Sequence, residues 1–248
     1  MYKEKISAWV DAHKDEMIED ICELCRINSE KMPEEEDMDM PFGPGAAECL
    51  DTALDMAEGY GFETCSYDGY VGCVDMNELP HQLDILAHLD VVPAGEGWTV
   101  TEPFKPVVKD GKLYGRGTAD DKGPAVAALY AMRAVKELGI PLKKNVRLIL
   151  GTDEECGSSD IKYYYSQEKE APMTFSPDAA YPLVNTEKGR FPGHFTAKFA
   201  CSDALPKLVS IQAGTKVNVV PGKAKAVVEG FTADVLETAA AETETETG

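Results

Sequence analysis

Basic residues are scarce in this chain of 248 residues: Lys and Arg together number 24, against 44 Asp and Glu, which gives a formal net charge of −20. A protein of this charge needs a local basic cluster to follow a phosphate backbone or an anionic membrane surface. The sequence contains no such cluster. We therefore expect neither nucleic acid nor a membrane among its partners.

Long apolar runs are also absent, since no stretch approaches the ~18 consecutive apolar residues of a membrane-spanning helix. The first residues, Met1–Lys5, lack the apolar core of a secretion signal. The seven cysteines are an odd number and lie mostly in apolar segments, which favours reduced thiols. Cys22 and Cys25 form a Cys-x-x-Cys pair inside a helical pattern, and we interpret them as half-buried helix residues rather than a metal or redox motif. These features predict a cytoplasmic protein.

Hydrophobic periodicity predicts helices that alternate with strands as far as residue 186. Helices are expected at residues 3–27, 45–58, 123–138 and 158–169, and strands at 62–67, 70–76, 83–87, 106–109, 112–114, 146–150 and 173–176. The strands at 83–87 and 146–150 are short, mostly apolar runs, consistent with buried strands. This alternation predicts an α/β domain with a mostly parallel sheet sandwiched by helices.

The pattern changes after Thr186. Residues 190–200 and 208–230 alternate with a period of two, which is typical of strands with one exposed face. Beyond them lies an acidic tail of Glu and Thr repeats, which we expect to be solvated. We therefore predict a first domain over residues 1–186 and a smaller α+β unit over residues 187–248.

Acidic residues and one histidine follow the ends of the predicted buried strands, where open α/β sheets bind their ligands. They are His88, Asp90, Asp120, Asp121, Asp153, Glu154, Glu155 and Asp178. Crowded carboxylates repel one another, and burial increases that cost, so a multivalent cation would stabilise them. Oxygen ligands with one or two imidazoles and no thiolate suit zinc, manganese or cobalt. The alternative is a set of unrelated helix caps and turn residues.

Several longer motifs occur in a fixed order along the chain. They are LAHLDVVP at 86–93, DGKLYGRGTADDKG at 110–123, GTDEECGS at 151–158, SPDA at 176–179, EKG at 187–189 and NVVP at 218–221. In these motifs the chain resembles the aminoacylase/carboxypeptidase clan of dinuclear-zinc hydrolases, and within it the PepV-type dipeptidases. The resemblance implies a zinc-peptidase-like catalytic domain followed by part of a lid domain, and a dipeptide or short peptide as substrate.

The resemblance also implies two divalent metal ions, zinc first and manganese or cobalt as alternatives. It implies that His88 and Asp178 bind the first ion, that Asp120 bridges both ions, and that Glu155 binds the second. The family further has a cis peptide after the bridging aspartate, here between Asp120 and Asp121.

Three more residues receive roles from the same resemblance. Glu154 matches the general base, Asp90 matches the acid that holds the His88 ring, and Asn218 matches a lid residue that approaches the substrate. The chemistry agrees for Asp90, because residues two apart on a strand share a face and a carboxylate can fix the imidazole tautomer. Asn218 is equally well interpreted as a turn asparagine.

The sequence departs from the family in its histidines. The family supplies one more histidine to the second metal and another to the oxyanion, and His13, His81 and His194 are not in matching contexts. We therefore expect an incomplete form of the enzyme, with little catalysis by these 248 residues alone. We also expect exposed apolar surface or an exposed strand edge, which would make the chain poorly soluble or cause it to self-associate.

Two alternatives to a dipeptidase remain open from the sequence. One keeps the metal site but takes an N-acyl amino acid as substrate. The other is a non-catalytic fragment that needs a complementary chain.

Overall fold

A computed structural model describes residues 2–32, 40–189, 191–199, 202–214 and 220–247. The chain forms two compact units, Met1–Val184 and Asn185–Gly248. Among the described residues, no helix combines the length and apolar character needed to cross a membrane.

The first unit contains most of the regular structure, in the order that the sequence predicts. Its helices are α1 (Tyr2–Arg26), α2 (Pro44–Gly59), α3 (Lys122–Glu137) and α4 (Ser159–Gln167), with a short 3-10 helix η1 (Glu154–Cys156). Its strands are β1 (Glu63–Tyr67), β2 (Val71–Asp75), β3 (His81–His88), β4 (Val107–Lys109), β5 (Lys112–Tyr114), β6 (Asn145–Gly151) and β7 (Met173–Phe175).

The central sheet has the strand order β1-β2-β6-β3-β7, and β4 and β5 form a separate hairpin. Strand β3 runs parallel to both β6 and β7, whereas β2 runs antiparallel to β6 and to β1. Only β2 therefore opposes the common direction in this sheet, which confirms the prediction of a mostly parallel sheet. The carboxyl ends of β3, β6 and β7 meet at one edge.

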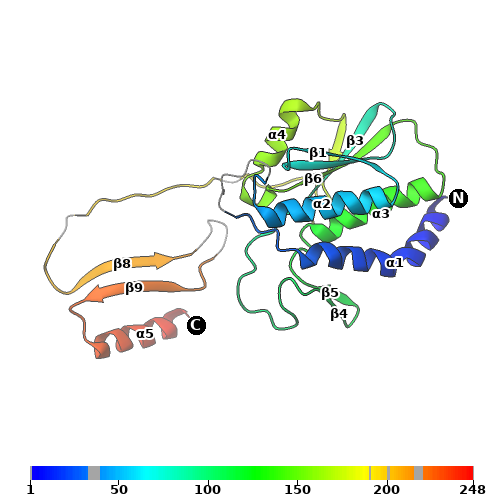
Figure 1. Ribbon diagram of the computed structural model, residues 1–248. Coiled ribbons are helices and arrows are strands. Elements are labelled where there is room, and N and C mark those ends of the chain that lie inside the picture. The colour runs from blue at the N-terminus through cyan, green and yellow to red at the C-terminus, as the bar shows by residue number, and fades with distance from the viewer. Residues whose placement is uncertain (1, 33–39, 190, 200–201, 215–219, 248) are drawn as a thin grey trace. The chain divides into compact units, whose positions relative to one another are not determined.

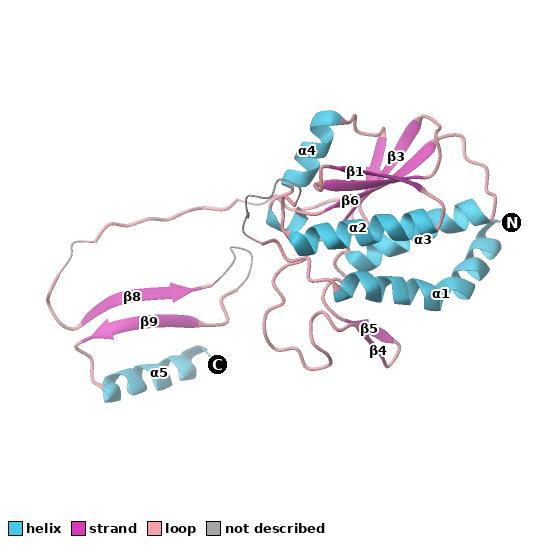
Figure 2. Cartoon of the chain, in the orientation of Figure 1, coloured by secondary structure: helices cyan, strands magenta, loops and turns pink. Residues whose placement is uncertain are grey.

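Helices cover both faces of this sheet, as Figure 2 shows. Helices α1, α2 and α3 lie on one face and α4 lies on the other (Figure 1). Alternate side chains of β6 follow this division, because Leu148 and Leu150 belong to the larger core beneath α1–α3 and Ile149 packs with Tyr164 of α4. Strand β7 is an edge strand whose Met173 and Phe175 are 59% and 48% exposed.

The second unit contains the antiparallel hairpin of β8 (Lys207–Ala213) and β9 (Ala224–Glu229), followed by α5 (Ala233–Thr247). The strand expected at 190–200 is wrong for the described residues 191–199, which form no regular element. Alternation predicts a strand only where a partner strand can pair with it. The acidic tail is helical, consistent with the high helix propensity of its alanines.

A fully buried lysine, the first residue of α3, connects that helix to the end of α1. The Nζ atom of Lys122 donates to the backbone oxygens of Leu24 and Ile27, at 2.9 and 2.8 Å. These carbonyls lie at the end of α1, where unpaired backbone oxygens and the helix dipole favour a cation. The contact therefore fixes α1 against the residues that directly follow Asp120 and Asp121.

We predict that Lys122→Met lowers the free energy of unfolding by about 3 kcal/mol, since one buried and one partly buried carbonyl lose a charged donor while side-chain volume changes little. Urea denaturation followed by circular dichroism measures this change. Lys14→Met, at an exposed position of α1, is the matched control and should shift stability by less than about 0.5 kcal/mol. Equal effects of the two substitutions would contradict the capping role.

Candidate metal centre

Three of the predicted ligands converge at the carboxyl edge of the sheet. His88 is the last residue of β3, Asp178 follows the end of β7, and Asp120 precedes α3. One ligand atom from each of these residues lies within 4.8 Å of the others. Because β3 and β7 are neighbouring parallel strands, their ends deliver side chains to the same point.

The His88 ring shows whether this cluster fits a cation. Its Nε2 atom lies 3.2 Å from Asp120 Oδ1 and 3.4 Å from Asp178 Oδ2. The residue is 3% exposed, and no hydrogen bond from the described residues satisfies this buried nitrogen. Two carboxylate oxygens and an unsatisfied imidazole nitrogen that point to one place form a donor set suited to a divalent ion.

The charges around His88 also favour a cation at this site. Burial alone would lower the pKa of the ring, but the Asp120 and Asp90 carboxylates outweigh burial and raise that pKa to about 11. His88 in turn lowers the pKa of Asp120. The carboxylates thus stabilise positive charge at the ring, which either a proton or a metal ion can supply.

Asp90 connects the ring to the loop that follows β6. Its Oδ1 atom lies 3.3 Å from His88 Nδ1, while its backbone oxygen lies 3.0 Å from the same nitrogen. The two carboxylate oxygens accept the backbone N–H groups of Glu154 and Glu155, each at 3.0 Å. One buried carboxylate therefore orients both the ring and the two acidic residues of η1.

The two glutamates occupy different positions relative to the cluster. Glu154 Oε2 lies 3.9 Å from His88 Nε2, and its side chain is 50% exposed. Burial of its carboxyl group, reinforced by the neighbouring acids Glu155 and Asp178, raises the pKa of Glu154. Glu155 is half-buried and is not among the three residues whose ligand atoms converge.

Asp120 and Asp121 are joined by a cis peptide, as the family resemblance implies. Asp121 is fully buried, and its Oδ2 atom accepts the backbone N–H of His88 at 3.1 Å. Close packing places this segment, because a Cβ atom on Gly123 would lie 2.1 Å from the backbone oxygen of Thr118. Glycine therefore allows α3 to start directly against the loop that carries Asp120.

The segment that follows α1 also holds the site together, which the sequence reasoning missed. Ser29 Oγ donates to the backbone oxygen of Leu89 at 2.6 Å, and Glu30 Oε1 accepts the backbone N–H of Ala94 at 2.8 Å. Lys31 Nζ lies 2.8 Å from the buried Asp153 Oδ1. No local motif marks these residues, since their partners are about 60 to 120 positions away in the chain.

Other residues of the predicted set stabilise the loop that follows β6 and are not among the three converging ligands. Asp153 pairs with Lys31 and accepts the backbone N–H of Ser159 at 3.1 Å. Asp160, which the sequence did not single out, is fully buried and accepts the backbone N–H groups of Thr152 and Asp153 at 2.6 and 2.9 Å. Asn218 lies outside the described residues.

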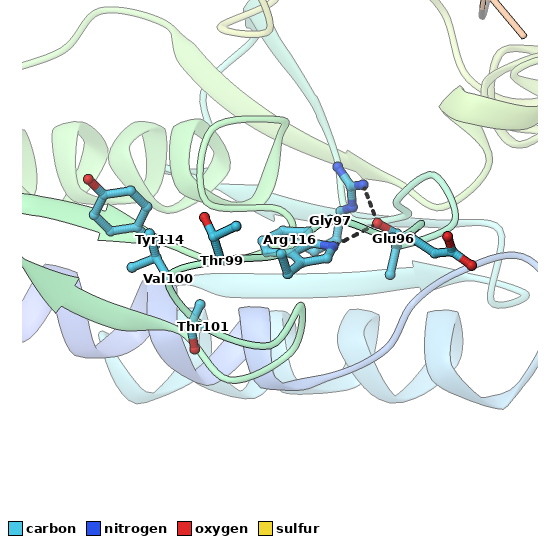
Figure 3. Close-up of a pocket in the computed structure, with 9 residues that line it drawn as sticks. Glu96, Gly97, Thr99, Val100, Thr101, Tyr114 and Arg116 are labelled. Atoms are coloured by element: carbon cyan, nitrogen blue, oxygen red, sulfur yellow. Dashed lines mark hydrogen bonds between the residues drawn. The ribbon is translucent and has the colours of Figure 1, made fainter. Parts of the chain in front are cut away.

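A shallow pocket of about 400 Å³ lies beside the loop that follows β3 (Figure 3). The Arg116 guanidinium lies over the Trp98 ring at 5.6 Å. Both side chains donate to the backbone oxygen of Ala94, Trp98 Nε1 at 2.9 Å and Arg116 at 3.2 Å. These contacts hold the 94–98 loop to the segment that leads to Asp120.

A mostly parallel sheet with a histidine and carboxylates at its carboxyl edge is typical of a metal-dependent α/β enzyme. Residues 85–247 match peptidase family M20/M25/M40. The chain belongs to this family.

The curated relatives extend this result. The chain is 40% identical to the protein YtjP of Bacillus subtilis, a match that covers 88% of this chain and 47% of YtjP. It is 38% identical to the Beta-Ala-Xaa dipeptidase of Lactobacillus delbrueckii subsp. lactis, a match that covers 89% of this chain and 47% of that protein. The chain therefore spans about half the length of the curated relatives it matches.

Solved structures share the fold. Human carnosine dipeptidase 1 aligns with a TM-score of 0.60 and 26% identity, over 70% of this chain and 40% of the human chain. An M20 family metallo-carboxypeptidase of Sulfolobus solfataricus aligns with a TM-score of 0.55 and 23% identity, over 65% of this chain and 37% of the other. The α/β architecture predicted from the sequence is thereby confirmed.

We predict that Asp90→Asn weakens Zn²⁺ binding by about 10- to 100-fold. An amide has one acceptor oxygen in place of two, and its NH₂ group would face a backbone N–H donor. Titration against a fluorescent zinc chelator measures the affinity, and circular dichroism checks the fold. Asp110→Asn, in the exposed β4–β5 turn, is the control. If both variants bind zinc like the unsubstituted chain, Asp90 does not position the ligands.

Proposed function

We propose that this chain is the metal-binding part of a dinuclear metal-dependent dipeptidase, which hydrolyses the peptide bond of dipeptides or short peptides. The convergence of His88, Asp120 and Asp178 within 4.8 Å carries this proposal. Membership of the peptidase family and similarity to the Beta-Ala-Xaa dipeptidase support it. In this proposal residues 1–186 form the catalytic domain, residues 187–248 begin a lid domain, and the protein is cytoplasmic.

The proposed cofactor is a pair of divalent ions, zinc first and manganese or cobalt as alternatives, held by one imidazole and three carboxylates. His88 and Asp178 would bind one ion, Asp120 both ions and Glu155 the second. Bound ions of this kind polarise a carbonyl group and lower the pKa of a water molecule. The unsatisfied Nε2 atom of His88 supports this assignment.

Glu154 is the proposed general base, with Asn218 proposed to approach the substrate. The Glu154 carboxylate is near the cluster and half exposed, so it can take a proton from the attacking water and exchange it with solvent. Its raised pKa makes it a better proton acceptor than an ordinary glutamate. Asp90 would act through His88 and the backbone of η1, as a positioning residue.

We predict that, in the enzyme of which this chain is the proposed metal-binding part, Glu154→Gln lowers kcat for dipeptide hydrolysis by at least about 100-fold while metal content stays unchanged, because the amide cannot accept the proton. Steady-state kinetics on the dipeptides that the unsubstituted protein hydrolyses, with metal analysis of the same samples, test this. Glu102→Gln, an exposed carboxylate paired with Lys105, should have no effect. Full activity of Glu154→Gln would remove Glu154 from the base role.

In the same enzyme, Asp120→Ala should instead lose both metal ions, since a bridging ligand serves both. Metal analysis after dialysis should give less than one ion per chain for this variant, against two for the unsubstituted protein. Asp51→Ala, on an exposed position of α2, is the control. Retention of one ion by Asp120→Ala would show that Asp120 is not a bridge.

The alternative functions are an N-acyl amino acid amidohydrolase and a non-catalytic fragment that needs a complementary chain. A panel of dipeptides and N-acetyl amino acids, assayed with zinc, manganese or cobalt, separates them. Preference for the acylated substrates favours the first alternative. No turnover combined with one bound ion or none favours the second.

A further inference from the structure

Two cysteines face each other across the β1–β2 hairpin at one edge of the sheet. Neither is among the residues proposed to bind metal or to transfer a proton. Strands β1 and β2 pair antiparallel with Cys65 directly opposite Cys73. Residues in such a pair share one face of the sheet, with Cα atoms about 4.5–5.5 Å apart. Disulfides span Cα distances of about 4.4–6.8 Å. The strand register therefore places the two Cα atoms at a separation that a disulfide can span.

The two thiols differ sharply in their exposure. Cys65 lies on the outermost strand and is exposed, whereas Cys73 is fully buried and packs with Ile149 and Tyr164 beneath α4. Cys65 is therefore accessible to a solute in water, whereas Cys73 is not. This asymmetry suits a pair in which one thiol is oxidised and the other resolves the product.

Neighbouring groups also shift the pKa values of the two thiols in opposite directions. Contact with the Cys73 thiol lowers the pKa of Cys65 to about 7. Burial and the Asp75 carboxylate oppose this shift, and the Arg147 guanidinium supports it. The same contact, together with burial, raises the pKa of Cys73. The lowered pKa favours the thiolate, which is the reactive form, at Cys65, and the raised pKa favours the protonated thiol at Cys73.

We propose that Cys65 and Cys73 form a peroxide-reactive dithiol, in which Cys65 is the oxidised thiol and Cys73 the resolving thiol. The Cys65 thiolate attacks one oxygen of a hydroperoxide, so the O–O bond breaks, a sulfenic acid forms and hydroxide or alkoxide leaves. The Cys73 sulfur then attacks the sulfenic sulfur, an S–S bond forms, and the hydroxyl group leaves with the Cys73 proton as water. Two electrons pass from the dithiol to the peroxide.

Disulfide mapping of the unsubstituted protein tests this directly. The reduced protein is treated with hydrogen peroxide at pH 7, remaining thiols are blocked with N-ethylmaleimide, and the chain is digested with chymotrypsin. Cleavage after Tyr67 and Tyr70 separates the two cysteines, so a disulfide appears as two joined peptides, two hydrogens lighter than their sum. We expect this pair as the main oxidation product, and reduction should release the two peptides.

Matched variants assign the order of events. In Cys73→Ala, Cys65 should stop at the sulfenic acid, which dimedone traps. In Cys65→Ala, Cys73 should remain reduced and be blocked by N-ethylmaleimide only after unfolding. Cys156→Ala removes the other exposed thiol of the described residues and should leave the disulfide unchanged. Circular dichroism confirms that each variant folds.

Two results would overturn the proposal. One is recovery of Cys65 and Cys73 as separate blocked peptides while peroxide is consumed elsewhere, for example at Cys156. The other is a disulfide that joins different chains, seen as a dimer on a non-reducing gel. Because both results come from the unsubstituted protein, the test does not depend on any variant folding.

Discussion

The first unit depends on one electrostatic constraint, which is that several carboxylates meet a buried imidazole at the edge where three parallel strands end. Asp120 and Asp178 approach within 3.4 Å of the His88 ring, and Asp90 approaches it from the other side. Such an arrangement is costly unless positive charge accompanies it. The raised pKa of His88 reflects this preference for positive charge, which a pair of divalent ions would supply.

Much of the surrounding structure holds these groups in place despite their repulsion. Asp90 uses both carboxylate oxygens to fix the backbone of Glu154 and Glu155, and Lys31 neutralises the buried Asp153. Lys122, the residue directly after Asp121, donates to carbonyl oxygens at the end of α1 and so holds that helix beside the Asp120–Asp121 segment. The site therefore rests on backbone hydrogen bonds and ion pairs of residues outside the proposed ligand set, as sites built on rigid supports do.

The chain combines hard and soft chemistry on different parts of one sheet. Oxygen and nitrogen donors collect at the carboxyl edge of β3 and β7, where a hard or borderline cation binds well. The Cys65 and Cys73 thiols lie instead on the β1–β2 hairpin, where the two residues are opposite each other. No thiolate ligand is assigned to the cation, so oxidation of the hairpin would leave the proposed ligands intact.

The order of helices and strands in the first unit was predictable from the sequence, because apolar periodicity and turn residues act locally. The motifs also identified candidate ligands, because His88 and Asp178 lie at or just after strand ends and Asp120 lies in the segment before α3. Tertiary structure alone decided which of these groups meet, that Asp153 pairs with Lys31, and that Cys65 faces Cys73. It also left residues 191–199 without a strand. The reason is physical: contacts between distant segments depend on strand order and register, which local patterns do not encode.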